Sequence, residues 1–238
     1  MHHPPCPGAG ADQAPSGGFG GSGANGPPGL SGVHIRCYKG IQPLSGNVCC
    51  ICGKQIGDEE IHCKDCKDTH HLFKQSVAAY EINAELKDSL YRFKYRHKRE
   101  YASFYAKSIL NAHKDLLLFM QPELIIPIPM YYKKERQRGY NQAALIAEEL
   151  GKCLGLPVNT HALVRTKKTV PLKDCSASER REILSEAFEL REDPGVKRVL
   201  AVDDIYTTGA TLDACAAVLK RSRVEEVYGA AVCIGAGA

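Results

Sequence analysis

Apolar and polar residues follow one another in a strand-then-helix order that is clearest at residues 199–219. Four consecutive apolar residues at 199–202 precede Asp203 and Asp204, a small hydroxyl-rich turn, and a helical repeat. An uninterrupted apolar run of this kind is typical of a strand that is covered on both faces in a parallel sheet. Residues 123–129 and 227–234 have the same strand character. The pattern therefore predicts an α/β fold with a mostly parallel sheet.

Helical spacing fills most of the chain between these strands. From residue 80 to residue 120, apolar residues such as Leu86, Leu90 and Phe93 recur at steps of three, four or seven, and residues 143–154 continue as a helix. Ser176 begins an S-x-x-E sequence that is typical of a helix start, so we expect a further helix there that carries Arg180 and Arg181.

The residues after the run at 199–202 have the composition of a sugar-phosphate site. Open α/β sheets bind ligands beyond the carboxyl ends of their strands, which is where Asp203 and Asp204 fall. Ionised carboxylates accept hydrogen bonds and therefore suit the vicinal hydroxyls of a sugar. A phosphate, by contrast, is attracted by backbone N–H groups at a helix start, and Gly209 allows the tight turn that exposes them. Hydroxyl donors at the same turn come from Thr207, Thr208 and Thr211. The alternative is an ordinary strand-to-helix turn with a polar N-cap.

The sequence VLAVDDIYTTGAT at 199–211 resembles the phosphoribosyl pyrophosphate (PRPP) fingerprint of type I phosphoribosyltransferases. In that family, paired acids hold the ribose 2′ and 3′ hydroxyls and the next loop wraps the 5′-phosphate. The resemblance implies that Asp203 and Asp204 are the catalytic acids. It implies a phosphate loop made of Thr207, Thr208, Gly209, Ala210 and Thr211. The turn after the 123–129 strand resembles the family's pyrophosphate loop, and because proline lacks an N–H, Ile128, Met130 and Tyr131 are the expected donors.

Two basic segments are candidates for the pyrophosphate end of the ligand. Arg136 and Arg138 follow the 123–129 strand and can make bidentate contacts with a pyrophosphate. The segment at 162–169 stands where such enzymes keep a mobile hood, and either Lys167 or Lys168 is its expected contact. The alternative for the first segment is a solvated run of charge.

Five of the eleven cysteines lie between Cys49 and Cys66. Because the sequence shows no export signal, metal binding is favoured over disulfides. Two C-x2-C pairs, Cys49/Cys52 and Cys63/Cys66, can close a tetrahedral Zn²⁺ site without an open position, which makes the site structural. Cys50 leaves the register of the first pair open, reduced cysteines without metal are the alternative, and the reserve ligands are His62, His70 and His71.

Composition limits the remaining choices. The net charge of +4 is too small to demand nucleic-acid binding, although residues 91–99 alternate five basic residues with aromatic ones. That segment fits either a phosphate-rich partner, nucleic acid or substrate, or a solvated helix face with its aromatics in the core. No apolar run approaches eighteen residues, so we expect a cytoplasmic chain without membrane insertion. Residues 1–32 are dominated by Gly, Pro, Ala and Ser and should be disordered.

Taken together, these motifs resemble the ComF family over residues 48–233. We expect a disordered leader at 1–45, and the resemblance implies a zinc ribbon at 46–75 and a phosphoribosyltransferase type I domain at 76–238. It implies PRPP and Mg²⁺ as ligand and cofactor, an unidentified acceptor, and a link to natural competence, with single-stranded DNA and competence helicase or DNA-handling proteins as candidate partners. The alternative is a non-catalytic DNA-binding accessory or PRPP sensor. The chain departs from the family pattern at Leu172, Lys173 and Ile183, which bears on acceptor-side contacts.

Overall fold

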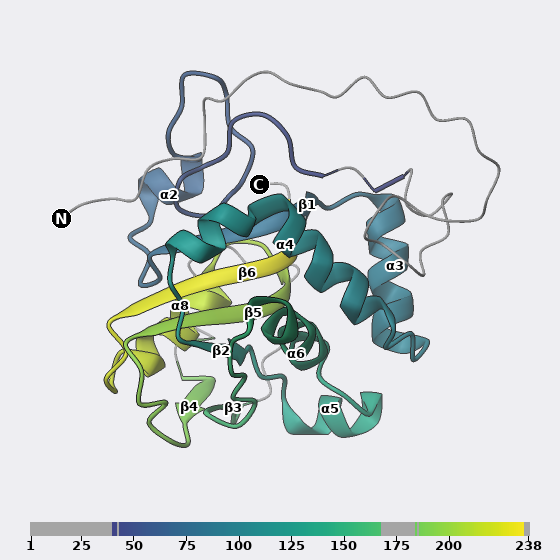
Figure 1. The fold of residues 1–238 in the computed structure, drawn as a ribbon, viewed down its shortest axis with the longest axis vertical. Helices are drawn as coiled ribbons and strands as arrows, with labels where there is room; N and C mark the ends of the chain where they lie inside the picture. Colours follow the sequence, from purple (N-terminus) through teal and green to yellow (C-terminus); the bar gives the residue numbers. More distant parts are fainter. Residues whose placement is uncertain (1–39, 42, 168–183, 185, 236–238) are drawn as a thin grey trace.

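The computed structural model describes residues 40, 41, 43–167, 184 and 186–235 (Figure 1). Residues 1–39 and 42 of the expected leader, Lys168, the S-x-x-E helix start with Arg180 and Arg181, and the departures at Leu172, Lys173 and Ile183 lie outside these residues.

A four-stranded parallel sheet forms the centre of the molecule. The sequence predicts a mostly parallel sheet and three of its strands, whereas the strand at residues 75–81 was not expected. Its strands are β1 (Gln75–Glu81), β2 (Leu124–Pro127), β5 (Arg198–Tyr206) and β6 (Glu226–Ile234), in the order β1-β6-β5-β2. Each neighbouring pair is parallel. The strands at 123–129 and 227–234 were predicted to within two residues at each end.

The central residues of the strands are mainly apolar, and each face of the sheet is covered by a different layer. On one face, Leu200 and Val202 pack in a buried core with the helices α3 (Ala84–Tyr95), α4 (Tyr101–Phe119) and α6 (Gln142–Leu154). Figure 1 shows α4 and α6 in front of the sheet. On the other face, Val199 and Ala201 share a second core with helix α8 (Ala210–Leu219) and with the cysteines of the ribbon segment, residues 46–75.

Four short elements complete the described part of the chain. Helix α2 (Lys64–Asp68) lies in the ribbon segment, helix α5 (Tyr132–Arg138) follows β2, and β3 (Leu163–Arg165) pairs antiparallel with β4 (Phe188–Leu190). The helical region expected at 80–120 begins later than its spacing suggests, because residues 80 and 81 still belong to β1, and it is split between α3 and α4. Within the described residues, no helix is long and apolar enough to cross a membrane.

Candidate functional site

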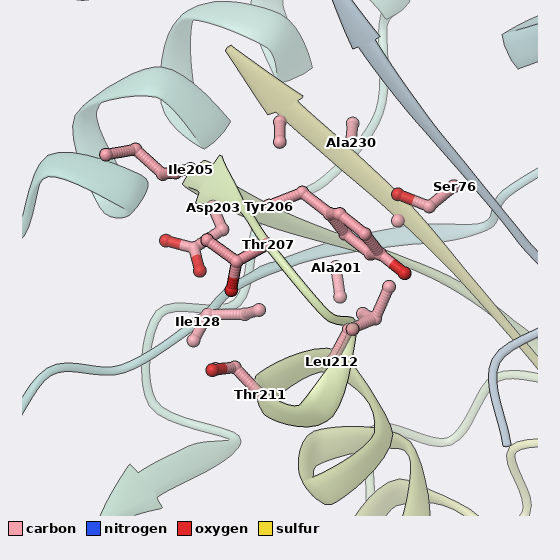
Figure 2. Close-up of a pocket in the computed structure, with 13 residues that line it drawn as sticks. Ser76, Ile128, Ala201, Asp203, Ile205, Tyr206, Thr207, Thr211, Leu212 and Ala230 are labelled. Carbon is pink, nitrogen blue, oxygen red and sulfur yellow. The ribbon is translucent and has the colours of Figure 1, made fainter. Parts of the chain in front are cut away.

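Side chains from three segments meet at the carboxyl end of β5. Asp203 lies in the last part of the strand, and it shares a pocket with Thr207, Thr211 and the side chain of Ile128 (Figure 2). β5 is longer than the apolar run indicates, since Asp203 and Ile205 still pair with Ala231 and Cys233 of β6. The acids therefore belong to the strand end itself and are held by its ladder.

The two acidic residues have different electrostatic surroundings. Although part of Asp203 reaches solvent, protein surrounds its carboxyl group, and this desolvation, followed by the charge of Asp204, raises the pKa of Asp203 to about 7. Asp203 Oδ1 also accepts a hydrogen bond of 2.8 Å from the backbone N–H of Asp204. The Asp204 carboxylate instead pairs with Lys94, with 2.5 Å between Oδ2 and Nζ. Near neutral pH the pair can therefore hold one proton while Asp204 stays paired with a cation.

Lys94 is a site residue that sequence reasoning did not select. Burial disfavours the charge of Lys94, but the carboxylates of Asp204 and Asp203 outweigh this cost and raise its pKa. Its side chain is 20% exposed, whereas Phe93 beside it is fully buried. Lys94 lies four residues after the buried Leu90, so helical spacing puts it at the edge of the buried face of α3. That position at the edge of the buried face was the one sign in the sequence that Lys94 could point towards the site.

The phosphate loop, residues 207–211, leads directly into α8. Gly209 is the N-cap residue of the helix and has a φ of 79°, in the left-handed region that favours glycine. The hydroxyl oxygen of Thr208 is buried and has no hydrogen-bond partner within the described part of the chain. A buried hydroxyl without a partner is unfavourable and fits a loop whose polar groups are completed by a ligand.

A cationic cavity of about 260 Å³ lies beside Asp204, between the end of α3 and α5. The residues that line it are Lys94, Tyr95, His97, Lys134, Gln137 and Arg138. The Arg138 guanidinium lies over the Tyr95 ring, 4.9 Å from its centroid, and hydrogen-bonds to Gln142. The cavity therefore combines several positive side chains with a fixed arginine, an arrangement suited to a polyanion.

The other predicted pyrophosphate contacts are either hydrogen-bonded or paired within the protein or lie outside the cavity. The backbone N–H of Ile128 donates to the carbonyl of Val202 at 2.8 Å, so the prediction that it donates to a ligand is wrong: it extends the β2–β5 ladder by one residue. Arg136 is exposed and does not line the cavity. Lys167 is exposed and pairs with Glu186, with 2.5 Å between Nζ and Oε2. Met130 is partly buried and lies outside both pockets.

Arg165 approaches the site from β3, in the hood segment. Its guanidinium lies over the Phe188 ring, 5.4 Å from the centroid. Burial lowers the pKa of Arg165, while Cys215 and then Asp203 act in the opposite direction. A partly buried arginine near Asp203 adds a positive side chain that the sequence did not single out.

The four predicted cysteines gather in one buried cluster. The Sγ atoms of Cys49, Cys52, Cys63 and Cys66 all lie within 4.8 Å of one another, and those of Cys52 and Cys63 are 3.5 Å apart. Tetrahedral zinc with Zn–S bonds of about 2.3 Å needs sulfurs roughly 3.8 Å apart, so this arrangement fits the ion. Hydrogen bonds from Cys52, then Cys63 and Cys66, lower the pKa of the Cys49 thiol. Cys50 is outside the cluster, as are His62, His70 and His71.

The first cysteine pair is shaped by its turn. Gly53 adopts a φ of 79° and its N–H donates to the carbonyl of Cys49 at 2.9 Å. In the second pair, the N–H of Lys67 donates to the carbonyl of Cys63 at 3.0 Å. Both knuckles therefore present their sulfurs to the same point.

The chain is similar to known proteins over most of its length. Residues 137–237 match the phosphoribosyl transferase domain family. The chain is 30% identical over 203 residues to competence protein F of Haemophilus influenzae, covering 83% of this chain and 88% of that protein. It is 28% identical over 198 residues to competence protein ComFC of Bacillus subtilis, covering 76% and 74%. DNA utilization protein YhgH of Escherichia coli O157:H7 is 26% identical over 195 residues, with 80% and 85% covered.

Proposed function

The chain belongs to the ComF family, and from that premise we propose that it binds PRPP and transfers the 5-phosphoribosyl group to an acceptor. The observation that carries the proposal is the meeting of Asp203 with Thr207 and Thr211 at the end of β5, one residue from a second acid. A carboxylate pair beside a helix-start loop suits a ligand with sugar hydroxyls at one position and a phosphate at the next.

Each part of PRPP has a set of side chains in this proposal. Asp203 and Asp204 accept hydrogen bonds from the ribose 2′ and 3′ hydroxyls, while the N–H groups and hydroxyls of residues 207–211 bind the 5′-phosphate. With both ends held, the reacting carbon has a fixed position. The bond from ribose C1 to pyrophosphate breaks, pyrophosphate leaves with the electron pair, and a nitrogen nucleophile of the acceptor attacks C1. Asp203 and Asp204 stabilise the positive charge that develops on the sugar.

Magnesium fits the donor set at this site. Carboxylate oxygens are ligands that Mg²⁺ prefers, so Asp203 and Asp204 would hold the ion directly or through the ribose hydroxyls, and it would neutralise the leaving pyrophosphate.

The cationic cavity beside Asp204 supports the pyrophosphate end of the proposal. Lys94 lies between Asp204 and this cavity and touches both. When ribose hydroxyls take over Asp204, the Lys94 ammonium can pair with a pyrophosphate oxygen without leaving its cavity. Arg138 supplies the bidentate contact, since its fork is already oriented by Tyr95 and Gln142.

Titration calorimetry with PRPP and Mg²⁺ tests the proposal, and its pH dependence gives a specific expectation. Ionised Asp203 accepts two hydroxyl hydrogen bonds, and burial raises its pKa to about 7. PRPP affinity should therefore rise severalfold from pH 6 to pH 8. No detectable binding at either pH would overturn the proposal, and a screen of bases and amines for pyrophosphate release separates an enzyme from a PRPP sensor.

Arg138→Ala should weaken PRPP binding roughly tenfold or more, because a hydrogen bond to a charged group is worth about 1.5–3 kcal/mol. The affinity for ribose 5-phosphate, which lacks the pyrophosphate, should change little. The control is Arg221→Ala, an exposed arginine after α8. Equal losses for both ligands would place Arg138 outside the pyrophosphate contact.

We propose that the four cysteines hold one Zn²⁺ in a structural site, within a ribbon at 46–75 that precedes a transferase domain at 76–238. The closeness of the four sulfurs, which lie within 4.8 Å of one another, supports this assignment. We also propose a cytoplasmic location, where thiols are kept reduced and available to a metal.

Single-stranded DNA is a second candidate ligand, favoured by the outer surface of α3 and α5. Tyr91, Tyr95 and Tyr132 are 52%, 57% and 59% exposed, beside the cations of the cavity. Exposed aromatic rings among cations are typical of single-strand binding, and the competence and DNA utilization names of relatives agree with it. The basic-aromatic stretch at 91–99 serves three places: Phe93 lies in the core, Lys94 lies in the site, and Tyr91 and Tyr95 lie on the surface.

Tyr91→Ala with Tyr95→Ala should reduce single-stranded DNA affinity at least tenfold, since each stacked base contributes about 1–3 kcal/mol. Phe119→Ala, which removes another exposed ring at the end of α4, is the control. Binding should weaken steeply with salt. A flat salt response would remove the phosphate-contact argument.

A further inference from the structure

The segment that follows the cysteine cluster holds the first turn of α8 from behind. His71 Nδ1 donates to Asp213 Oδ2 at 2.8 Å, and the backbone N–H of Leu72 donates to Asp213 Oδ1 at 2.8 Å. The side chains of His71 and Asp213 are only 2% and 11% exposed. Both carboxylate oxygens of an α8 residue are therefore used to fasten the helix to the ribbon segment.

Asp213 is tied directly to the phosphate loop. It lies in the first turn of α8, and its N–H donates to the carbonyl of Gly209 at 2.8 Å. This bond begins the helix whose free N–H groups face the proposed 5′-phosphate. A shift of Asp213 would therefore move the carbonyl and the turn at Gly209 with it.

Three aromatic rings close the space behind Gly209. A Cβ atom added there would lie 2.5 Å from Tyr206 Oη, 2.9 Å from His71 Cε1 and 3.1 Å from Phe73 Cε1. The His71 and Phe73 ring centroids are 4.5 Å apart, and Phe73 meets Tyr206 edge-on at 6.2 Å. The turn of the loop thus rests against two rings that come from the ribbon side of the chain.

The same core contains the cysteine cluster. Cys49, Cys52, Cys63 and Cys66 belong to one buried cluster with Phe73, Tyr206, Ala210 and Leu212. Small four-cysteine segments commonly order only when the metal is bound. The support behind the phosphate loop therefore depends on the order of the cysteine cluster.

We propose that His71, Phe73 and Asp213 are positioning residues for the phosphate loop, through which metal binding at the four cysteines and binding of a phosphate monoester at residues 207–211 are linked. The phosphate part of this inference rests on the proposed function. Linkage is reciprocal, so metal removal should weaken phosphate binding and a bound phosphate ligand should slow metal loss.

The test uses the zinc-loaded full chain and compares Asp213→Ala, Asp213→Asn and the parent. Hydrogen exchange at the amides of residues 207–211 should be at least about fivefold faster in Asp213→Ala, and PRPP affinity should fall by about 5- to 100-fold. Asp213→Asn keeps an acceptor for the Leu72 N–H and should restore most of both. Ser108→Ala, which removes a buried hydrogen bond of 2.7 Å to Tyr80 on the opposite face of the sheet, is the control and should change neither.

The exchange measurement separates this inference from the proposed function. If the parent does not bind PRPP, the proposed function fails, while faster loop exchange in Asp213→Ala and in metal-free parent still supports the positioning role. Unchanged exchange at 207–211 in both, or equal acceleration in Ser108→Ala, would overturn the inference. Should Asp213→Ala fail to fold, loop exchange in the metal-free parent, measured against the zinc-loaded parent, tests the same inference.

Discussion

Replacing Asp203 and Asp204 together with asparagine is expected to abolish detectable PRPP binding by a protein that still folds. Asparagine keeps the size of each side chain but removes the charge that strengthens a hydrogen bond from a hydroxyl. Hydrogen bonds to charged groups contribute about 1.5–3 kcal/mol each, so losing two should weaken binding on the order of 100- to 10,000-fold. Calorimetry with PRPP and Mg²⁺ at pH 8 measures the difference directly.

The control for this variant is a double replacement with the same change in charge. Asp58→Asn with Asp68→Asn alters two exposed carboxylates of the ribbon segment and should leave PRPP affinity unchanged. Equal binding by the site variant and the parent, with PRPP bound by both, would show that the acids do not hold the ribose.

Asp203→Asn alone separates binding from stability. Burial raises the folded-state pKa of Asp203 to about 7, above its ordinary value of 3.8, so the folded protein binds this proton more readily than the unfolded chain. Ionisation of Asp203 therefore destabilises the folded protein. This effect begins as the pH rises past 3.8 and is complete above about 7. Asp203→Asn should therefore be more stable than the parent at pH 8, on the order of 1–3 kcal/mol, with the difference shrinking towards pH 5. Affinity and stability thus change in opposite directions across the same pH range.

Three strands of the sheet and the acid pair could be predicted because their signals are local. The strands are buried on both faces, so their sequences are continuous apolar runs, and the acids follow directly in the chain. The cysteine cluster is equally local, because both of its pairs have knuckle spacing and Gly53 eases the first turn. In each case neighbouring residues in the sequence decide the structure.

The remaining site residues depend on contacts between distant segments. Lys94 reaches Asp204 only because α3 and β5 end at the same edge of the fold. His71 reaches Asp213 across 142 residues. The N–H of Ile128 was expected to face a ligand, but its use depends on how far β2 pairs with β5. No periodicity within one segment reports such pairings, although the place of Lys94 beside the buried stripe of α3 was a partial signal.

Cys63→Ser should cost the protein its zinc and much of its stability. A serine hydroxyl is a poor replacement for a thiolate, and structural zinc contributes about 10–16 kcal/mol of apparent binding energy in small domains. The expected loss of stability is smaller than this range, because the cysteines also pack in the core beneath the sheet and this packing helps to order the ribbon without the metal. We expect a loss of at least about 3 kcal/mol in the free energy of unfolding, which for a chain of this size lowers Tm by roughly 6–12 °C.

The matched control is Cys153→Ser, an exposed cysteine on α6 and remote from the cluster, which should keep one zinc per chain and the parent's Tm. Metal content and thermal unfolding are measured on the same samples under reducing, chelator-free conditions. Far less than one zinc in the parent would rule out the metal assignment. A parent with one zinc and a Cys63→Ser variant with an unchanged Tm would mean that the core alone orders the ribbon. In that case metal binding would not stabilise the phosphate loop through Asp213. Metal binding at the ribbon and phosphate binding at the loop would then be independent, although the ribbon and the loop share a core.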